Sequence, residues 1–237
     1  MFMMTINLDD KGLKSIAHKF DLFFIDIWGV VHNGIRLFED SIQTLDELKK
    51  INKEYVLLTN APRPNSTVIK FLKKIGLDNE KCKNVYTSGE AALNYLHNNC
   101  KDLKFFHIGP PRDFDLFKLF EKNKVKKIEE SDFLLCTGLF DSHENELDYY
   151  KKLFENKTSK KMVCTNPDLI VDRGNEREFC AGSIAKIFEE LGGKVEYFGK
   201  PYPLVYTQAR AIKNKKILCI GDNLNTCLLY TSDAADE

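Results

Sequence analysis

The sequence predicts an α/β protein with a doubly wound parallel sheet. Short apolar runs alternate along the chain with segments of helical periodicity, an order typical of β-α-β units. The helical segments fill the spaces between successive runs, as right-handed crossovers between parallel strands require. Several runs are followed at once by polar residues or glycine, and ligands of open α/β sheets bind at such strand ends.

The first part of the chain contains three predicted strands and two predicted helices. The strands are the apolar runs 22–27, 55–58 and 85–87. Apolar residues at helical spacing predict the two helices: Ile42, Leu45, Leu48 and Ile51, then Val68, Ile69, Leu72 and Ile75. Asn65 is a candidate cap for the second helix, and Gly76 suits its end.

The rest of the chain repeats this alternation. Further apolar runs predict strands at 105–108, 133–136, 162–164, 195–198 and 217–220. Helical patterns predict helices at roughly 113–123, 143–156, 184–191 and 202–213. No internal repeat or low-complexity linker is visible, so the sequence itself marks domain boundaries only weakly.

The composition is that of a soluble globular protein, with 43% hydrophobic and 30% charged residues. Lys+Arg and Asp+Glu are both 35, so there is no broad basic field for nucleic acid. No apolar stretch approaches a membrane span, and the start MFMMTINLDDKG turns polar too soon for a signal peptide. We therefore expect a cytoplasmic protein without a membrane or nucleic-acid partner. None of the seven Cys forms a C-x-x-C pair, which disfavours a zinc site.

The last residues differ in character from the rest. Residues 227–237, CLLYTSDAADE, resemble the translation of a sequencing-library adapter. We therefore expect this tail to be non-native and the natural chain to continue past Thr226. The alternative is a genuine polar tail.

Four predicted strand ends carry residues suited to phosphate or metal chemistry. Asp26 ends the first run in FFIDIWGVVHNG, and an Asp there can be a nucleophile or a metal ligand. Thr59 and Asn60 follow the second run, where a hydroxyl and nearby N–H groups can hold phosphate oxygens. Lys200 follows the run 195–198 and can neutralise both a phosphate and a carboxylate. Asp222 follows the last run and supplies a second carboxylate, suited to Mg²⁺.

Each of these signals has a plainer explanation when taken alone. An Asp at a strand end before Gly is often a simple turn, Thr59 could cap a helix, and Lys200 could be a surface lysine. Their order is more specific, because each follows a predicted parallel strand. All four would therefore meet at one edge of the sheet.

The order and the flanking residues resemble the haloacid dehalogenase-like (HAD) superfamily. The strings TNPDLIV, CAGSIA and FGKPYP are similar to motifs of its subfamily IIA, and DIWGVVHNG resembles a branch with Trp two residues after the nucleophile. The resemblance implies a Rossmann-like core of residues 1–90 and 191–226. An α/β cap would occupy residues 91–190, and 227–237 would lie outside the fold.

The resemblance also implies roles for the motif residues. Asp26 would attack phosphorus and form an aspartyl-phosphate, assisted by the hydroxyl of Thr59 and by Lys200. Asp26, the backbone carbonyl of Trp28 and Asp222 would hold Mg²⁺. Most HAD phosphatases carry an acid/base Asp at the position of Trp28, whose indole only donates a hydrogen bond. Losing that group costs roughly 10²–10⁴-fold in rate, so we expect slow turnover of alkyl phosphates and a smaller loss with aryl or acyl phosphates.

Further residues near these motifs are candidate substrate-binding groups. His32, in the loop after Asp26, could replace the missing acid, or it could only pack or cap the loop. Arg63, close after Asn60, would add charge near the phosphate, or lie on the surface. Asn166 and Asp168 in the cap loop could touch the leaving group, or form a turn.

The predicted function is a Mg²⁺-dependent phosphohydrolase acting on a small phosphorylated metabolite. The alternative, favoured by Trp28, is a catalytically degenerate HAD protein that binds a phosphorylated ligand or partner. A different nucleotide-binding enzyme is weaker, because neither G-x-G-x-x-G nor the Walker pattern is present. Capped enzymes of this kind often pair through the cap, so a homodimer is one expectation, although the sequence itself settles no oligomeric state.

Overall fold

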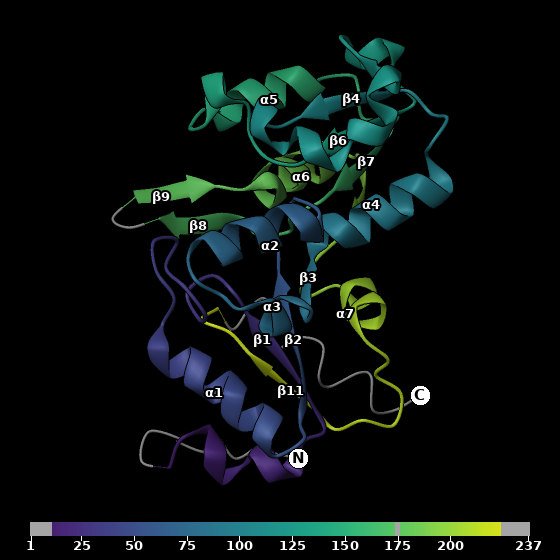
Figure 1. Ribbon diagram of the computed structural model, residues 1–237. Coiled ribbons are helices and arrows are strands. Elements are labelled where there is room, and N and C mark those ends of the chain that lie inside the picture. The colour runs from purple at the N-terminus through teal and green to yellow at the C-terminus, as the bar shows by residue number, and fades with distance from the viewer. Residues whose placement is uncertain (1–10, 174–175, 224–237) are drawn as a thin grey trace, which may run out of the picture.

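The computed structural model describes residues 11–173 and 176–223, whose strands form three sheets (Figure 1). The lower sheet in Figure 1 has four parallel strands in the order β11-β1-β2-β3. The upper sheet has five parallel strands in the order β10-β7-β6-β4-β5. An antiparallel hairpin, β8-β9, projects to the left of the view.

The strand bounds follow the chain order. In the four-stranded sheet they are Leu22–Asp26 (β1), Glu54–Thr59 (β2), Val85–Thr87 (β3) and Ile217–Ile220 (β11). In the five-stranded sheet they are Phe105–Ile108 (β4), Lys124–Val125 (β5), Phe133–Cys136 (β6), Lys161–Cys164 (β7) and Lys194–Tyr197 (β10). The hairpin consists of Ile170–Arg173 (β8) and Glu176–Phe179 (β9).

The helices connect these strands. The α-helices are Glu39–Lys50 (α1), Asn65–Lys74 (α2), Asn79–Cys82 (α3), Ser88–Asn99 (α4), Leu147–Phe154 (α5), Ala181–Glu190 (α6) and Pro203–Ala209 (α7). The 3₁₀ helices are Leu13–Ser15 (η1), Ala17–Lys19 (η2), Pro111–Leu116 (η3), Lys118–Asn123 (η4), Ile128–Glu130 (η5) and Asp141–His143 (η6). No helix within these described residues is long and apolar enough to cross a lipid bilayer.

Strand β1 is covered on both faces. Leu22 and Phe24 pack with side chains of α4 and α7, whereas Phe23 and Ile25 pack with side chains of α1 and α2. Successive side chains point to opposite faces, so a strand covered on both sides has a continuous apolar sequence. Helices on both faces of a parallel sheet confirm the predicted doubly wound α/β fold.

Helix α4 joins the apolar cores of the two larger sheets. Its residues Ala91 and Leu96 belong to the same buried cluster as Leu22 of β1. That cluster also contains Phe105 and Phe133 of the five-stranded sheet. Figure 1 shows α4 lying between the two sheets. A continuous apolar cluster therefore connects them.

Four predicted strands, at 85–87, 105–108, 133–136 and 217–220, have the observed bounds. The segment 113–123, predicted as one helix, instead forms parts of η3 and η4, because the backbone of Phe120 is not helical. Leu116, Phe117 and Phe120 are all buried against the Phe105 region, so tertiary packing overrides the helical periodicity here. Strand β5 and the β8-β9 hairpin were not predicted, because neither has a clear apolar period.

The strand predicted at 195–198 joins the five-stranded sheet. β10 pairs with β7 in parallel, with Val195 opposite Met162. The division expected from the sequence placed residues 191–226, and therefore β10, in the core with the four-stranded sheet. Because β10 pairs with β7, a boundary after residue 190 would separate β10 from the rest of the five-stranded sheet. Buried parallel strands have similar sequences in either sheet, so only the pairing decides which sheet a strand joins. The tail 227–237 lies outside the described residues.

Candidate active site

Three of the predicted strand-end residues lie at one edge of the four-stranded sheet. Asp26 ends β1 and pairs with Leu58 of β2, one residue before Thr59. On the other side of β1, Ile25 pairs with Ile220, the last residue of β11, and Asp222 follows closely. The parallel strands thus bring Asp26, Thr59 and Asp222 to the same carboxyl edge.

Lys200 and Asp26 form a buried ion pair. The Lys200 Nζ atom lies 2.6 Å from Asp26 Oδ2, and the two side chains are 3% and 12% exposed. The other oxygen, Oδ1, accepts a hydrogen bond of 2.7 Å from the backbone N–H of Ile27. The ammonium therefore neutralises the carboxylate at the end of β1.

The carboxylate of Asp222 lies directly against Gly29, in the loop after Asp26. A Cβ atom built on Gly29 would be 2.1 Å from Asp222 Oδ2, and the φ angle of Gly29 is +75°. Both the space and the backbone conformation therefore require glycine at this position. This close approach holds the second carboxylate beside the loop that carries the Trp28 carbonyl.

The donors at this edge fit Mg²⁺. The carboxylates of Asp26 and Asp222 and the carbonyl of Trp28 would supply hard oxygen ligands, and Mg²⁺ usually takes one or two carboxylates and keeps several waters. Because Gly29 has no side chain, the Asp222 carboxylate can lie against its backbone. A Cβ atom at Gly29 would fill that space. Within the described part of the chain, no group of three or more His, Cys, Asp or Glu is arranged to hold a metal ion, so the site offers two carboxylates and a carbonyl.

We expect Gly29→Ala to destabilise the protein by roughly 1–3 kcal/mol and to remove most of its stabilisation by Mg²⁺, because the new methyl group displaces Asp222. Urea unfolding with Mg²⁺ and with EDTA measures both effects. Gly192→Ala is the control, because Gly192 also has a positive φ of +89° but has nothing within 4 Å of its Cβ position. A Mg²⁺ response in Gly29→Ala equal to that of Gly192→Ala would contradict the expectation.

Asn60 connects the end of β2 to two distant loops through hydrogen bonds. Its side-chain NH₂ donates to Asp168 Oδ1 at 2.8 Å and to the backbone carbonyl of Lys200 at 3.0 Å. Its Oδ1 accepts from the backbone N–H of Lys200 at 2.7 Å. These contacts use both amide protons of Asn60, so in this arrangement the side chain positions Lys200 and Asp168.

Thr59 has a hydroxyl suited to a phosphate oxygen. Its Oγ1 accepts a hydrogen bond of 3.2 Å from the backbone N–H of Ala61, which leaves the hydroxyl proton to donate elsewhere. The residue is 7% exposed and lines the large cavity described below.

The loop between β7 and β8 brings Asp168 to the same site. Asn166 Oδ1 accepts from the backbone N–H of Asp168 at 3.0 Å, which closes a local turn, and the Asp168 carbonyl accepts from Gly182 at the start of α6. Burial raises the pKa of Asp168 to about 6, opposed by Asn60 and Lys200 and reinforced by Asp26 and Asp222. Asp168 is therefore close enough to both core carboxylates to sense their charge.

The raised pKa of Asp168 makes a testable contribution to stability. Below its usual pKa of 3.8 the carboxyl is neutral in both the folded and unfolded states. Between that pH and about 6 the unfolded chain ionises while the folded protein keeps the proton, so the free energy of unfolding falls as pH rises, and the loss is complete above about 6. We expect Asp168→Asn to be more stable than the parent by roughly 1–3 kcal/mol near pH 7, with the gain vanishing near pH 4.

Urea unfolding in EDTA across this pH range measures that difference. Asp148→Asn is the matched control, because the Asp148 side chain is 85% exposed and pairs only with Lys151 among the described residues. Its difference from the parent should stay nearly constant with pH. The expectation fails if Asp168→Asn behaves in the same way.

The loop after Asp26 is packed by aromatic rings. The ring centroids of Trp28 and His32 are 5.4 Å apart, and those of His32 and Phe71 are 5.5 Å apart. His32 is buried, and its Nδ1 accepts from the backbone N–H of Gly34 at 2.8 Å. Burial lowers the pKa of His32, which Asp26 partly opposes. His32 therefore supports the loop as a neutral ring, and its role as an acid stays a prediction.

A cavity of about 1320 Å³ lies between loops of the four-stranded sheet and loops of the five-stranded sheet. Predicted site residues in its wall are Trp28, His32, Thr59, Arg63 and Asn166. The wall also contains Phe71, Arg112, Asp113 and Thr137, which were not predicted. Thr137 directly follows β6, so the strand-end rule that identified Asp26 could have found it, whereas Phe71 and Asp113 carry no such signal.

The geometry can be compared with known proteins. Residues 23–121 match the family model described as haloacid dehalogenase-like hydrolase. Phosphoglycolate phosphatase 2 of Arabidopsis thaliana is 21% identical over 257 residues, which cover 96% of this chain and 84% of that protein. A hydrolase of the haloacid dehalogenase-like family from Brucella suis 1330 is 29% identical with a TM-score of 0.78, covering 90% of this chain and 82% of its own. The 4-nitrophenylphosphatase from Thermotoga maritima is 27% identical with a TM-score of 0.68, covering 89% and 81%.

Proposed function

We propose that this chain, a member of the haloacid dehalogenase-like hydrolases, is a phosphatase that hydrolyses phosphate esters of small metabolites. The observation that carries the proposal is the buried contact between Lys200 and Asp26, at the strand edge that also holds Thr59 and Asp222. The phosphatases among the similar proteins support the same reaction class.

In this proposal the Asp26 carboxylate attacks phosphorus and the bond between phosphorus and the leaving oxygen breaks. Lys200 and the Thr59 hydroxyl stabilise the phosphoryl oxygens while the aspartyl-phosphate forms. Water then attacks phosphorus, inorganic phosphate leaves and the Asp26 carboxylate is restored. Asn60 holds the Lys200 backbone in place throughout.

Magnesium is the cofactor that we propose. Asp26, the carbonyl of Trp28 and Asp222 would hold it, and when bound it supplies the positive charge that offsets repulsion between a carboxylate and a phosphate. The lack of a side chain at Gly29 supports this assignment, because it lets the Asp222 carboxylate lie beside the loop of Asp26 and Trp28.

Trp28 limits the proposed reaction. An indole cannot protonate the leaving oxygen or activate water, so the leaving group must depart as an anion that takes its proton from solvent. Leaving groups of low pKa, such as nitrophenol or a carboxylic acid, tolerate this better than alcohols do. The preferred substrates are therefore aryl or acyl phosphates.

A phosphatase panel with Mg²⁺ tests the proposed function. We expect hydrolysis of 4-nitrophenyl phosphate to exceed that of glycerol phosphate and to stop in EDTA. Equal or better turnover of a simple sugar phosphate would contradict the role given to Trp28, and full activity in EDTA would contradict the role of Mg²⁺.

A second candidate function is the binding of a phosphorylated ligand with almost no hydrolysis. The indole of Trp28 at the usual acid/base position is the observation that favours it. Calorimetric binding of inorganic phosphate in Mg²⁺ without turnover of any ester in the panel would support this candidate over the phosphatase.

A further inference from the structure

A chain of polar contacts runs from the cap to the wall of the cavity. Arg63 Nε donates to Asp113 Oδ1 at 2.9 Å, and the Asp113 side chain is 4% exposed. The Thr137 hydroxyl is close enough to Asp113 to favour its ionised form, and it lies 2.9 Å from Nε2 of His107. His107 is buried, and burial lowers its pKa to about 3, so the imidazole is neutral. A Thr137 hydroxyl that is directed toward Asp113 can at the same time accept a hydrogen bond from Nε2–H of the neutral His107.

The backbone of Arg63 is held as firmly as its side chain. The Thr87 hydroxyl donates to the Arg63 carbonyl at 2.6 Å. A Cβ atom on Gly89, at the start of α4, would lie 2.4 Å from the backbone N and O of Arg63. The loop is therefore pressed against α4 so closely that only glycine fits. A long side chain that starts from a fixed backbone and ends on a buried partner loses little further entropy when it binds a ligand.

The guanidinium of Arg63 keeps donors for a ligand. It carries five N–H groups, and among the described residues the contact to Asp113 uses only the one on Nε. The Arg63 side chain is 35% exposed and lines the same cavity as Trp28 and Thr59. A guanidinium fork with both Nη atoms open matches the two oxygens of a carboxylate or a phosphate.

We propose that Arg63 binds a second anionic group, a carboxylate or a further phosphate, on the leaving-group side of the phosphorylated substrate. Asp113, Thr137 and His107 are positioning residues that hold the guanidinium in place. The inference rests on the proposed function, because it assumes that the reacting phosphate lies at Asp26 and Lys200. It adds the class of substrate, a phosphate ester with a second negative charge.

The competing explanation is that the ion pair only connects the loop after β2 to η3 and that Arg63 binds no ligand. Arg63 belongs to the loop after β2 and Asp113 to η3 of the cap, so breaking the pair could loosen the whole cavity. A structural tie would weaken every ligand alike. A binding role would weaken only ligands that carry the second anion, and this difference separates the two explanations.

Isothermal titration calorimetry in Mg²⁺ with matched pairs of ligands tests the proposal. Phosphoglycolate is compared with 2-hydroxyethyl phosphate, and fructose 1,6-bisphosphate with fructose 6-phosphate, while inorganic phosphate reports on the phosphate site alone. We expect the parent to prefer the doubly anionic member of at least one pair by about 10- to 100-fold. The carboxylate pair and the phosphate pair together identify which second anion is bound.

Arg63→Gln should remove this preference and leave the Kd of inorganic phosphate unchanged. Thr137→Val should reduce the preference for the doubly anionic ligand. Thr137→Ser should keep it, because serine retains a hydroxyl beside Asp113. Arg210→Gln is the matched control, since Arg210 pairs with Glu54 at the opposite end of the sheet. It should bind every ligand as the parent does.

Three results would overturn the proposal. The first is a parent protein that shows no preference in either pair. The second is an equal loss for all ligands in Arg63→Gln, inorganic phosphate included. The third is an unchanged preference in that variant. Failure of the proposed function looks different, because 4-nitrophenyl phosphate would then not be hydrolysed by the parent, whatever the calorimetry shows.

Discussion

Replacing Asp26 with Asn lowers the kcat for 4-nitrophenyl phosphate by at least roughly 10⁴-fold, the order expected when a nucleophile is removed. The amide keeps the size and shape of the carboxylate but has no negative oxygen that can attack phosphorus. It also removes the partner of the buried Lys200 ammonium and one of the proposed ligands of Mg²⁺. Initial rates with Mg²⁺ at saturating substrate measure the effect.

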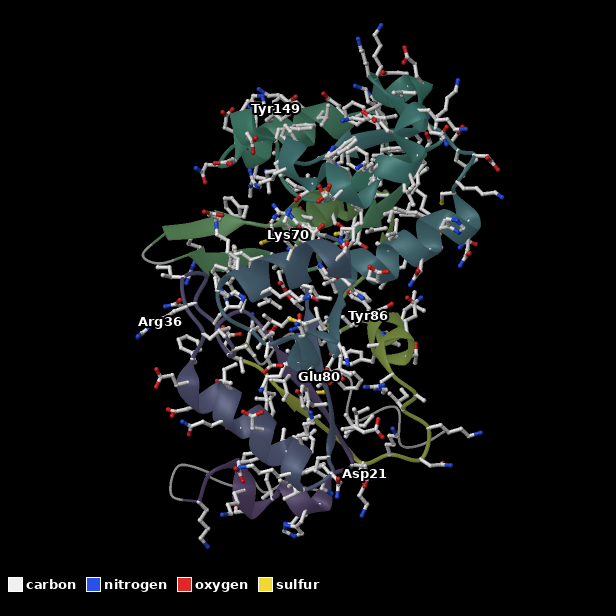
Figure 2. The ribbon with its side chains drawn as sticks, in the orientation of Figure 1. Asp21, Arg36, Lys70, Glu80, Tyr86 and Tyr149 are labelled. Atoms are coloured by element: carbon white, nitrogen blue, oxygen red, sulfur yellow. The ribbon has the colours of Figure 1, made fainter. Side chains whose placement is uncertain are left out.

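The matched control is Asp21→Asn, at the other end of the same strand. Asp21 precedes β1, and its Oδ2 accepts from the backbone N–H of Lys216 at 2.9 Å, on an exposed surface. Figure 2 shows Asp21 at the lower end of the molecule, away from the five-stranded sheet. This variant should keep the parent kcat. A folded Asp26→Asn protein, checked by circular dichroism, that retains a tenth or more of the parent rate would exclude Asp26 as the nucleophile.

Replacing Trp28 with Asp is expected to raise kcat for glycerol phosphate by roughly 10²–10⁴-fold. The new carboxyl group stands at the position that the sequence resemblance gives to the acid/base Asp of haloacid dehalogenase-like phosphatases, and it can protonate the leaving oxygen and then activate water. The Trp28 backbone carbonyl, the proposed metal ligand, is present in either protein. The gain should be much smaller for 4-nitrophenyl phosphate, because nitrophenolate leaves without a proton.

Trp28→Asn separates the chemical gain from the loss of the indole. Both variants lose the contacts of the Trp28 ring with His32 and with the backbone at Gly34, so both should be less stable. Only the Asp variant gains a group that can transfer a proton. Equal kcat values for the two variants on glycerol phosphate would show that position 28 does not supply the missing acid/base.

Much of the fold could be predicted from local sequence. The strand at 105–108 and the strand at 217–220 were located to the residue, because apolar runs that are buried on both faces differ sharply from the polar loops around them. Other segments were harder. The β8-β9 hairpin mixes charged and apolar side chains without a period, and Phe120 interrupts the helix expected at 113–123.

In the candidate site, too, some features could be predicted from local sequence and others could not. Asp26, Thr59 and Asp222 could be predicted because each lies at or just after the end of a strand of the four-stranded sheet, whose parallel strands end at one edge. Lys200 also follows a strand, but β10 belongs to the five-stranded sheet, so only the tertiary structure brings its ammonium to Asp26. Tyr86, in the short strand β3, shows the limit of such reasoning. Its hydroxyl donates to Gln208 of α7 at 2.9 Å, a contact with no local signal, and Figure 2 shows it facing that helix.

The sequence by itself determined which segments become strands and which polar residues follow them, because both depend on neighbours in the chain. Only the tertiary structure decided the partners of Asn60, which hydrogen-bonds to Asp168 and Lys200 across 108 and 140 positions. It likewise decided the pairing of Arg63 with Asp113, 50 positions apart, and the sheet that β10 joins. Such contacts depend on how distant segments pack, and no local pattern of residue types encodes that geometry.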